Sequence, residues 1–450
     1  ILILLLVIVL SAQVIGSGIE LYIVVIAPDT DDYLWDMIVT VDGIYVLADD
    51  AGSYNIYLFK LGNDGSYKWG LKIGFSNYIL PLKLVYHDKY VYIGTMIFEG
   101  GKYRFALIKI SAANGGYVAA KSYDIGGTAV YQLMLHDMIV VGNNIYALVQ
   151  SSYGQDEYIV VIDENLNILD NITIDRLYDD AEIIYDGNNI IVVGASSINN
   201  NPYHLEFLHF DTDLNFVKNV TVYADPYSFN MTSCFYDDTY SSEIWCVGNL
   251  YYEATDGYEF IGGYVVRYTI SSSDIEAFHY DGPGFIDIDN YFIVGKYDKY
   301  GMLMDFDYYT YSSDYPTWIC YNKPWQYSVI DGVYAAGTTN YDSTGYDVFV
   351  QLIDRSVIDD NVSYIDVNYD AIEFNSTIYT VNTTLSSIVN TVSGSLSTVQ
   401  IKMYSYDTSF TVSRISPVLR YYYYGRGWMH YIKFHNVFLE FISASMLYAA

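Results

Sequence analysis

Residues 37–49 read MIVTVDGIYVLAD: a short apolar strand, a polar turn at Asp42 and Gly43, and a second strand rich in Ile, Val and Tyr. Related stretches recur along the chain: LVYHDKYVYIGT from Leu84, IVVGNNIYALVQ from Ile139, IIYDGNNIIVVG from Ile183, and copies at Glu243, Ile286, Ser328 and Ala371. The copies are spaced by about 48 residues on average. Apolar strands that alternate with turn residues predict a β-hairpin repeated along the chain.

A second phrase lies between these copies and also alternates polar with apolar residues. It reads YNIYLFKLGNDGSYKWG from Tyr54, EYIVVIDENLN from Glu157 and LEFLHFDTDLN from Leu205. Each repeat therefore holds about four strands, which is the size of a propeller blade. We predict an all-β propeller of seven to eight four-stranded blades over residues 19–410. The alternative is a propeller over 19–360 followed by a small β domain over 361–410.

The N-terminal stretch GIELYIVVIAPDTDDYLW, from Gly18, resembles the second phrase. It could complete the last blade by pairing with C-terminal strands, which would close the ring. If the eighth repeat already has its own outer strand, the N-terminal strand is surplus. A surplus strand would pair with an edge of the ring or with a neighbouring molecule.

The phrases resemble those of secreted β-propeller repeat proteins of bacteria and archaea. Residues 42–46 (DGIYV) and 58–65 (LFKLGNDG), with Trp69, match best, and the resemblance extends over roughly residues 20–410. It implies the fold and very little about activity, because propellers serve binding, scaffolding and catalysis alike. The high content of Tyr, Asn, Ser and Thr is similar to that of archaeal surface proteins.

Composition excludes two classes of protein. The formal net charge is −32, and Lys and Arg are too scarce to neutralise a nucleic-acid backbone. Hydrophobic residues make up 52% of the chain, so disorder is excluded as well. The 53 tyrosines can serve either as half-buried residues with a polar tip or as exposed binding platforms, and we expect exposure for many of them.

Several features predict export. Residues 1–18 begin with an unbroken aliphatic run, which is typical of a secretory leader; a buried strand or a retained N-terminal assembly helix are the alternatives. Six Asn-x-Ser/Thr sequons are candidate glycosylation sites: Asn171, Asn219, Asn230, Asn361, Asn375 and Asn382.

The three cysteines fit neither a disulfide-rich scaffold nor a zinc site. Cys234 and Cys246 are separated by a strand, a polar turn and a strand, so we expect them to form a disulfide between neighbouring strands. Cys320 would then be left over and buried.

The C-terminal tail, residues 411–450, reverses the charge of the rest. It contains Arg414, Arg420, Arg426 and Lys433 but a single acid, Glu440, together with the run YYYY at 421–424. One interpretation is self-association, in which this tail docks on the acidic surface of another copy. The other is a strand that caps the ring. Membrane contact would involve only the termini.

Candidates for chemistry are few. The seven histidines are scattered, and the sequence contains no zinc-protease, phosphate-loop, nucleophile-elbow or dinucleotide motif. We predict no catalytic residue and no cofactor. Calcium is the candidate metal, at Asp211, Asp213 and Asn215, because these residues offer oxygen ligands at alternate positions. Most acidic pairs fall at turns, where Asp bonds its own backbone.

The sequence therefore favours an extracellular structural protein of the cell surface, a subunit of a filament or layer that associates with its own copies. The alternatives are a surface receptor for carbohydrate or another ligand and, less favoured, a secreted hydrolase.

Overall fold

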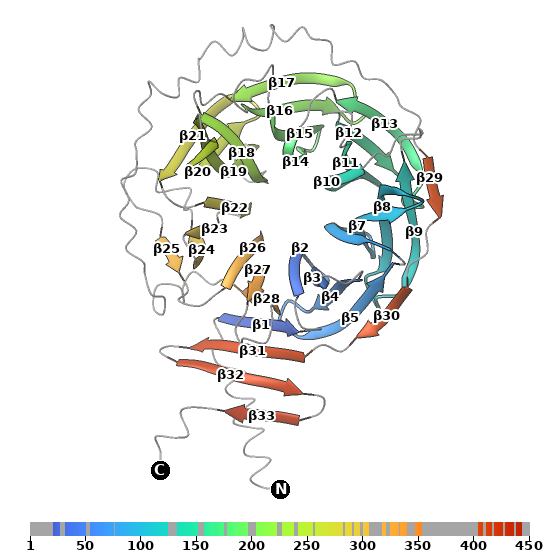
Figure 1. Cartoon of the computed structure of the whole chain (residues 1–450), viewed down its shortest axis with the longest axis vertical. Helices are drawn as coiled ribbons and strands as arrows, with labels where there is room; N and C mark the ends of the chain where they lie inside the picture. The colour runs from blue at the N-terminus through green and yellow to red at the C-terminus, as the bar shows by residue number, and fades with distance from the viewer. Residues whose placement is uncertain are drawn as a thin grey trace.

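In the computed structural model the secondary-structure elements of the described residues are all β-strands, arranged as sheets around a central axis (Figure 1). It describes residues 21–442 except the following segments: 28–31, 51–54, 76, 125–132, 152–156, 175–177, 197–203, 223–226, 238–241, 255–256, 282–283, 290–291, 298–299, 306–316, 321–324, 333, 340–346, 353–403, 408–410, 416–417, 426–427 and 436–437.

Six sheets each contain four consecutive strands, ordered from the axis outward. Blade 1 is β2 (Asp32–Thr40), β3 (Gly43–Asp50), β4 (Asn55–Leu61) and β5 (Tyr67–Gly74). Blade 2 is β6 (Ile79–His87), β7 (Tyr90–Glu99), β8 (Lys102–Ser111) and β9 (Tyr117–Asp124). Blade 3 is β10 (Leu133–Val141), β11 (Asn144–Ser151), β12 (Glu157–Ile162) and β13 (Ile168–Ile174).

The other three follow the same plan. Blade 4 is β14 (Tyr178–Tyr185), β15 (Asn189–Ser196), β16 (His204–Asp211) and β17 (Phe216–Val222). Blade 5 is β18 (Tyr227–Asp237), β19 (Glu243–Ala254), β20 (Gly257–Thr269) and β21 (Asp274–Asp281). Blade 6 is β22 (Gly284–Asp289), β23 (Phe292–Tyr297), β24 (Tyr300–Asp305) and β25 (Thr317–Cys320).

A composite sheet closes the ring between blades 6 and 1. Its inner strands are β26 (Trp325–Asp331), β27 (Tyr334–Thr339) and β28 (Asp347–Leu352), and β1 (Leu21–Ala27) takes the fourth position by pairing with β28. The innermost strands contact one another in chain order, and β26 contacts β2. The N-terminal strand thus pairs with a C-terminal strand to close the propeller, one of the two roles expected for it.

The expected count of seven to eight four-stranded blades needs correction. Six blades are built from four consecutive strands, and the sheet that closes the ring takes its fourth strand from the other end of the chain. The eighth copy of the repeated phrase, at Ala371, lies outside the described residues. The ring closes without it because β26 already packs against β2.

C-terminal strands extend three of the sheets at their outer edges (Figure 1). β29 (Tyr404–Asp407) pairs with β9, and β30 (Thr411–Ile415) pairs with β5. β31 (Val418–Gly425) pairs with β1 and continues through β32 (Trp428–His435) to β33 (Phe438–Ile442). The basic tail is therefore built onto the ring, and β31–β33 project beyond it.

The core lies between blades, because the middle strands are buried on both faces where their side chains are described. β4, β12 and β16 are buried almost throughout, and one cluster joins Tyr45 and Leu58 of blade 1 to Ile93 and Ile108 of blade 2. The apolar runs in these strands are thus explained by two-sided burial, with each sheet packed against its neighbours.

Tyrosines fasten neighbouring blades through their polar tips. The Tyr146 hydroxyl donates to the Thr212 carbonyl of the next blade at 3.0 Å, and Tyr334 donates to Asn63 at 2.8 Å. In the described part of the chain, Tyr33, Tyr117 and Tyr252 are the tyrosines among the exposed large apolar side chains, so the expected exposure of many tyrosines is not found there. Most of the described tyrosines are buried or partly buried, and several of their hydroxyls bond a backbone carbonyl.

Candidate functional site: the axial carboxylates

The innermost strands carry ionisable residues where their pairing is interrupted. A β-bulge precedes Asp36 on β2, Lys83 on β6, Asp137 on β10 and Asp287 on β22, and Glu182 lies beside the bulge of β14. A bulge leaves backbone groups without a ladder partner and turns a side chain in a new direction. The repeat thus places charged groups at similar positions around the axis.

Each carboxylate accepts a hydrogen bond from the backbone of the next sheet, so it acts as a staple between blades. The four bonds are Leu84 N to Asp36 Oδ2 (2.6 Å), Ile183 N to Asp137 Oδ2 (3.0 Å), Cys234 N to Glu182 Oε2 (2.7 Å) and Ile330 N to Asp287 Oδ2 (2.8 Å). In the same way Val39 N donates to Asp331, which closes the ring between β26 and β2. These bonds satisfy N–H groups that the bulges would otherwise leave buried and unpaired.

Lys83 is the cation of this group. Its Nζ lies 3.6 Å from Asp137 Oδ1, and 32% of its side chain is exposed. Burial opposes the charge of the amine, but attraction by Asp137, Glu182 and Asp36 outweighs it and raises the lysine pKa. The Lys83 ammonium thus interacts electrostatically with several carboxyl groups.

The carboxyl groups hold protons more tightly than usual. Burial, only partly offset by Lys83, raises the pKa of Asp36 to about 7 and that of Glu182 to about 8. Burial also raises the pKa of Asp287, and that of Asp331 to about 6. Such shifts are typical of functional sites but also of structural ion networks. Here both oxygens of Asp36 and both of Asp287 accept hydrogen bonds from backbone N–H groups, which favours a structural role for these carboxylates.

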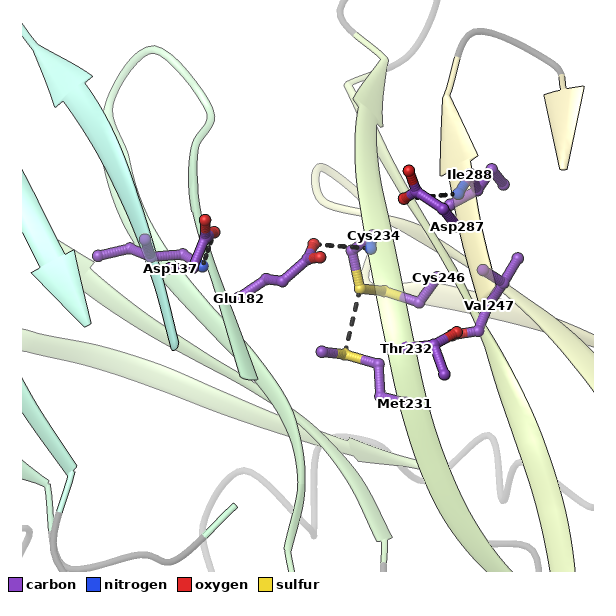
Figure 2. Close-up of a disulfide and its surroundings, with 10 residues drawn as sticks. Asp137, Glu182, Met231, Thr232, Cys234, Cys246, Val247, Asp287 and Ile288 are labelled. Carbon is purple, nitrogen blue, oxygen red and sulfur yellow. Dashed lines mark hydrogen bonds between the residues drawn. A yellow bond between two sulfur atoms is a disulfide. The ribbon is translucent and has the colours of Figure 1, made fainter. Parts of the chain in front are cut away.

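A disulfide lies directly beside the staple from Glu182 (Figure 2). The structure joins Cys234 of β18 to Cys246 of β19, which are opposite one another in the register. Glu182 points from β14 to the backbone N–H of Cys234, so blade 4 is fastened to the cross-linked hairpin of blade 5. Cys320 ends β25, and its side chain lies outside the description.

The calcium candidates form a turn. Asp211 Oδ1 accepts bonds from the backbone N–H groups of Asp213 (3.0 Å) and Asn215 (2.8 Å), and the Asn215 amide donates to Asp211 Oδ2 at 2.9 Å. Asp163 and Asn167 make the same pattern in blade 3. In the part of the chain that the structure describes, no three His, Cys, Asp or Glu side chains gather as a metal site.

The candidate glycosylation sites differ in position. Asn171 lies in β13 with 8% exposure, while Asn219 in β17 and Asn230 in β18 are partly exposed. Asn361, Asn375 and Asn382 lie outside the described residues.

The axial carboxylates were not predicted from the sequence. The signal was an acid at or just before the start of the first phrase, immediately before an apolar residue: Asp36-Met37, Asp137-Met138 and Asp287-Ile288. An acid within an apolar strand, repeated at the blade spacing, is the pattern to look for.

No family model and no curated sequence matches the chain. Solved structures similar to it include a prolyl endopeptidase (10% identity, TM-score 0.42, 72% of this chain and 47% of that one). They also include the β-propeller domain of the Trilobed protease from Pyrococcus furiosus (12% identity, TM-score 0.32, 60% and 95%) and the AfRom2 CNH domain (8%, 0.41, 74% and 99%). The chain thus spans about half the length of the prolyl endopeptidase, and the likeness to all three is one of fold. Among the described residues, no helix has the length and apolarity that crossing a bilayer requires.

Proposed function

We propose that the protein is a structural subunit of an extracellular assembly, at the cell surface or in a filament, whose copies join through the sheet that projects from the ring. The observation that carries this proposal is the composite sheet, which continues outward from β1 through β31 and β32 to β33. Within the described chain β33 pairs only with β32, so its other edge can accept a strand from a neighbouring copy.

Charge supports the same contact. The chain carries −32 overall, whereas the projecting strands contain Arg420 and Lys433 with Glu440 as their single acid. Opposite charge steers a tail of this kind toward the acidic body of another copy, and like charge keeps the bodies apart elsewhere. Extracellular location is supported by the Cys234–Cys246 disulfide, since such bonds persist in oxidising compartments.

The use of the axial carboxylates disfavours the hydrolase alternative. A glycosidase needs two carboxyl groups free to act on a substrate. Both carboxylate oxygens of Asp36 and both of Asp287 accept hydrogen bonds from backbone N–H groups of the ring.

The test compares the full chain with a deletion of residues 427–450, which removes β32 and β33 but keeps β31 on the ring. Light scattering and negative-stain microscopy over rising protein concentration should show ordered oligomers or filaments for the full chain and monomers for the deletion. Matching far-UV circular dichroism and thermal unfolding serve as the control for the fold. If the full chain stays monomeric at every concentration, or the deletion assembles equally well, the proposal is wrong.

A further inference from the structure

The outer strands of four consecutive blades begin with the same β-bulge. At this point the outer strand holds one residue more than the strand beside it: Lys68 on β5, Val118 on β9, Leu169 on β13 and Val217 on β17. The extra residue of a bulge leaves the regular ladder, and its side chain takes a new direction. In blades 2, 3 and 4 this residue is apolar and exposed, to 45% for Val118, 55% for Leu169 and 53% for Val217. We call these three side chains the rim ridge.

Apolar residues are unexpected at this position. Edge strands of soluble proteins usually carry charge, often lysine, which keeps other chains from pairing with them. Blade 1 follows this rule with Lys68, which is exposed. The rim ridge departs from it in three neighbouring blades, and the exposed side chain of Phe216 adds apolar area beside Val217. A single exposed apolar residue needs no explanation, but a series at equivalent positions indicates a contact surface.

Blades 2 and 3 are already joined beside the ridge. The Lys121 ammonium of β9 donates to Asn167 Oδ1 at 2.7 Å. Val118 lies three residues before Lys121, and Leu169 lies two residues after Asn167. The ridge residues of these two blades therefore flank one contact between their rims.

The turns beside the ridge are acidic in blades 3 and 4. Glu164 and Asp213 are exposed in the turns before β13 and β17, and Asp163 and Asp211 are partly exposed in the same turns. Lys218 of β17 is directed to blade 5, where its ammonium donates to the Ile270 carbonyl at 3.4 Å. This part of the rim thus combines apolar side chains with negative charge.

The projecting strands have the complementary composition. β31, β32 and β33 contain Arg420 and Lys433 with Glu440 as their single acid, and most of their other residues are apolar or aromatic. Opposite charge on two apolar surfaces speeds their encounter and selects one way of docking. A second copy of this chain therefore offers a surface that suits the ridge.

The ridge and the projecting strands lie on opposite sides of the ring (Figure 1). Seven sheets surround the axis, and blades 3 and 4 are the farthest from the composite sheet in either direction. A contact between these two surfaces joins different patches of two copies, so each added copy offers the same free surfaces again. Such a heterologous contact between opposite sides extends into a filament instead of stopping at a dimer.

We propose that the rim ridge receives strands β31–β33 of a second copy, so that the subunits join head to tail in a filament. The ridge supplies the apolar contact, and the acidic turns of blades 3 and 4 attract the basic strands. β17 is the last strand of its sheet within the described residues, which places it to pair with β33 of the incoming copy. This inference rests on the proposed function and adds the surface that the projecting sheet meets.

The test replaces the ridge by the residue that blade 1 carries at the same bulge, using Leu169→Lys together with Val217→Lys. Light scattering over rising protein concentration should show that assembly of this double variant begins at a concentration at least about tenfold higher than for the native chain. The control is Val41→Lys, which makes the same change at a fully exposed valine in the turn between β2 and β3 and should leave assembly unchanged. Circular dichroism and thermal unfolding check that all three proteins fold alike.

A mixing experiment tests the head-to-tail geometry. The double variant keeps the projecting sheet, and the deletion of residues 427–450 keeps the ridge. Neither should assemble alone, whereas their mixture should form dimers of one copy of each and stop there, because such a dimer has no matching pair of surfaces left. Analytical ultracentrifugation distinguishes dimers from monomers and filaments.

The outcomes separate this inference from the proposed function. A native chain that stays monomeric overturns both. If the native chain assembles and the deletion does not, but the double variant assembles like the native chain, the proposed function stands and the ridge inference is wrong. Mixtures that remain monomeric also overturn it. So does a double variant that assembles normally but unfolds at a lower temperature than Val41→Lys, since the ridge would then be covered by its own chain.

Discussion

Replacing Glu182 by Gln should remove part of the dependence of stability on pH. Burial raises the pKa of Glu182 from its ordinary value of 4.5 to about 8. Between these two pH values the unfolded chain has released this proton and the folded chain still holds it. Stability from this group is therefore present at acidic pH and is lost as pH rises through that window.

The magnitude follows from the width of the window. Each pKa unit corresponds to about 1.4 kcal/mol, so raising the pH from 5 to 9 should cost the native protein on the order of 4 kcal/mol through Glu182. Glutamine keeps an oxygen that can accept the 2.7 Å bond from Cys234 N but cannot ionise. We expect Glu182→Gln to match the native protein at pH 5 and to be more stable at pH 9.

The assay is urea unfolding followed by tryptophan fluorescence at pH 5, 7 and 9. Asp88→Asn is the matched control, because the Asp88 side chain is 66% exposed and lies outside the axial group. Asp36 remains in the variant and keeps some pH dependence, since its pKa is raised to about 7 in the same way. Parallel pH profiles for the native protein and Glu182→Gln would refute the reasoning.

Three further outcomes are expected. Asp211→Ala removes the hydrogen bonds that its carboxylate accepts in the turn and should lower the urea midpoint of unfolding, while adding calcium or a chelator should leave the native Tm unchanged; a calcium-dependent Tm would support the metal interpretation instead. Tyr146→Phe removes one bond between blades 3 and 4 and should cost about 1 kcal/mol by the same urea titration, so no loss would mean that the bond contributes nothing. Cys246→Ser opens the β18–β19 cross-link and should cost about 2–4 kcal/mol, a loss that reduction of the native protein should reproduce.

The sequence predicted the blade but left the ring closure open. The alternating phrase around Asp42 and Gly43 specifies a hairpin by itself, because its period and turn residues act locally. Whether the N-terminal strand closes the ring depends on a pairing between Ile23 and Gln351, which no local pattern encodes. The expected seven to eight blades exceed the six built from four consecutive strands, because the sheet that closes the ring takes its fourth strand from the N-terminal region.

The axial carboxylates escaped prediction for a physical reason. An acid such as Asp36 in an apolar strand is costly in isolation, and its partner, the N–H of Leu84, belongs to the next repeat. The decisive contact therefore joins elements that are distant along the chain.

Cryo-electron microscopy of the assembled full-length protein tests the central claim most directly. The account predicts that copies meet at the projecting sheet, with a strand of the neighbouring molecule paired along the free edge of β33. Contacts made through the faces of the ring, with β33 left unpaired, would contradict it.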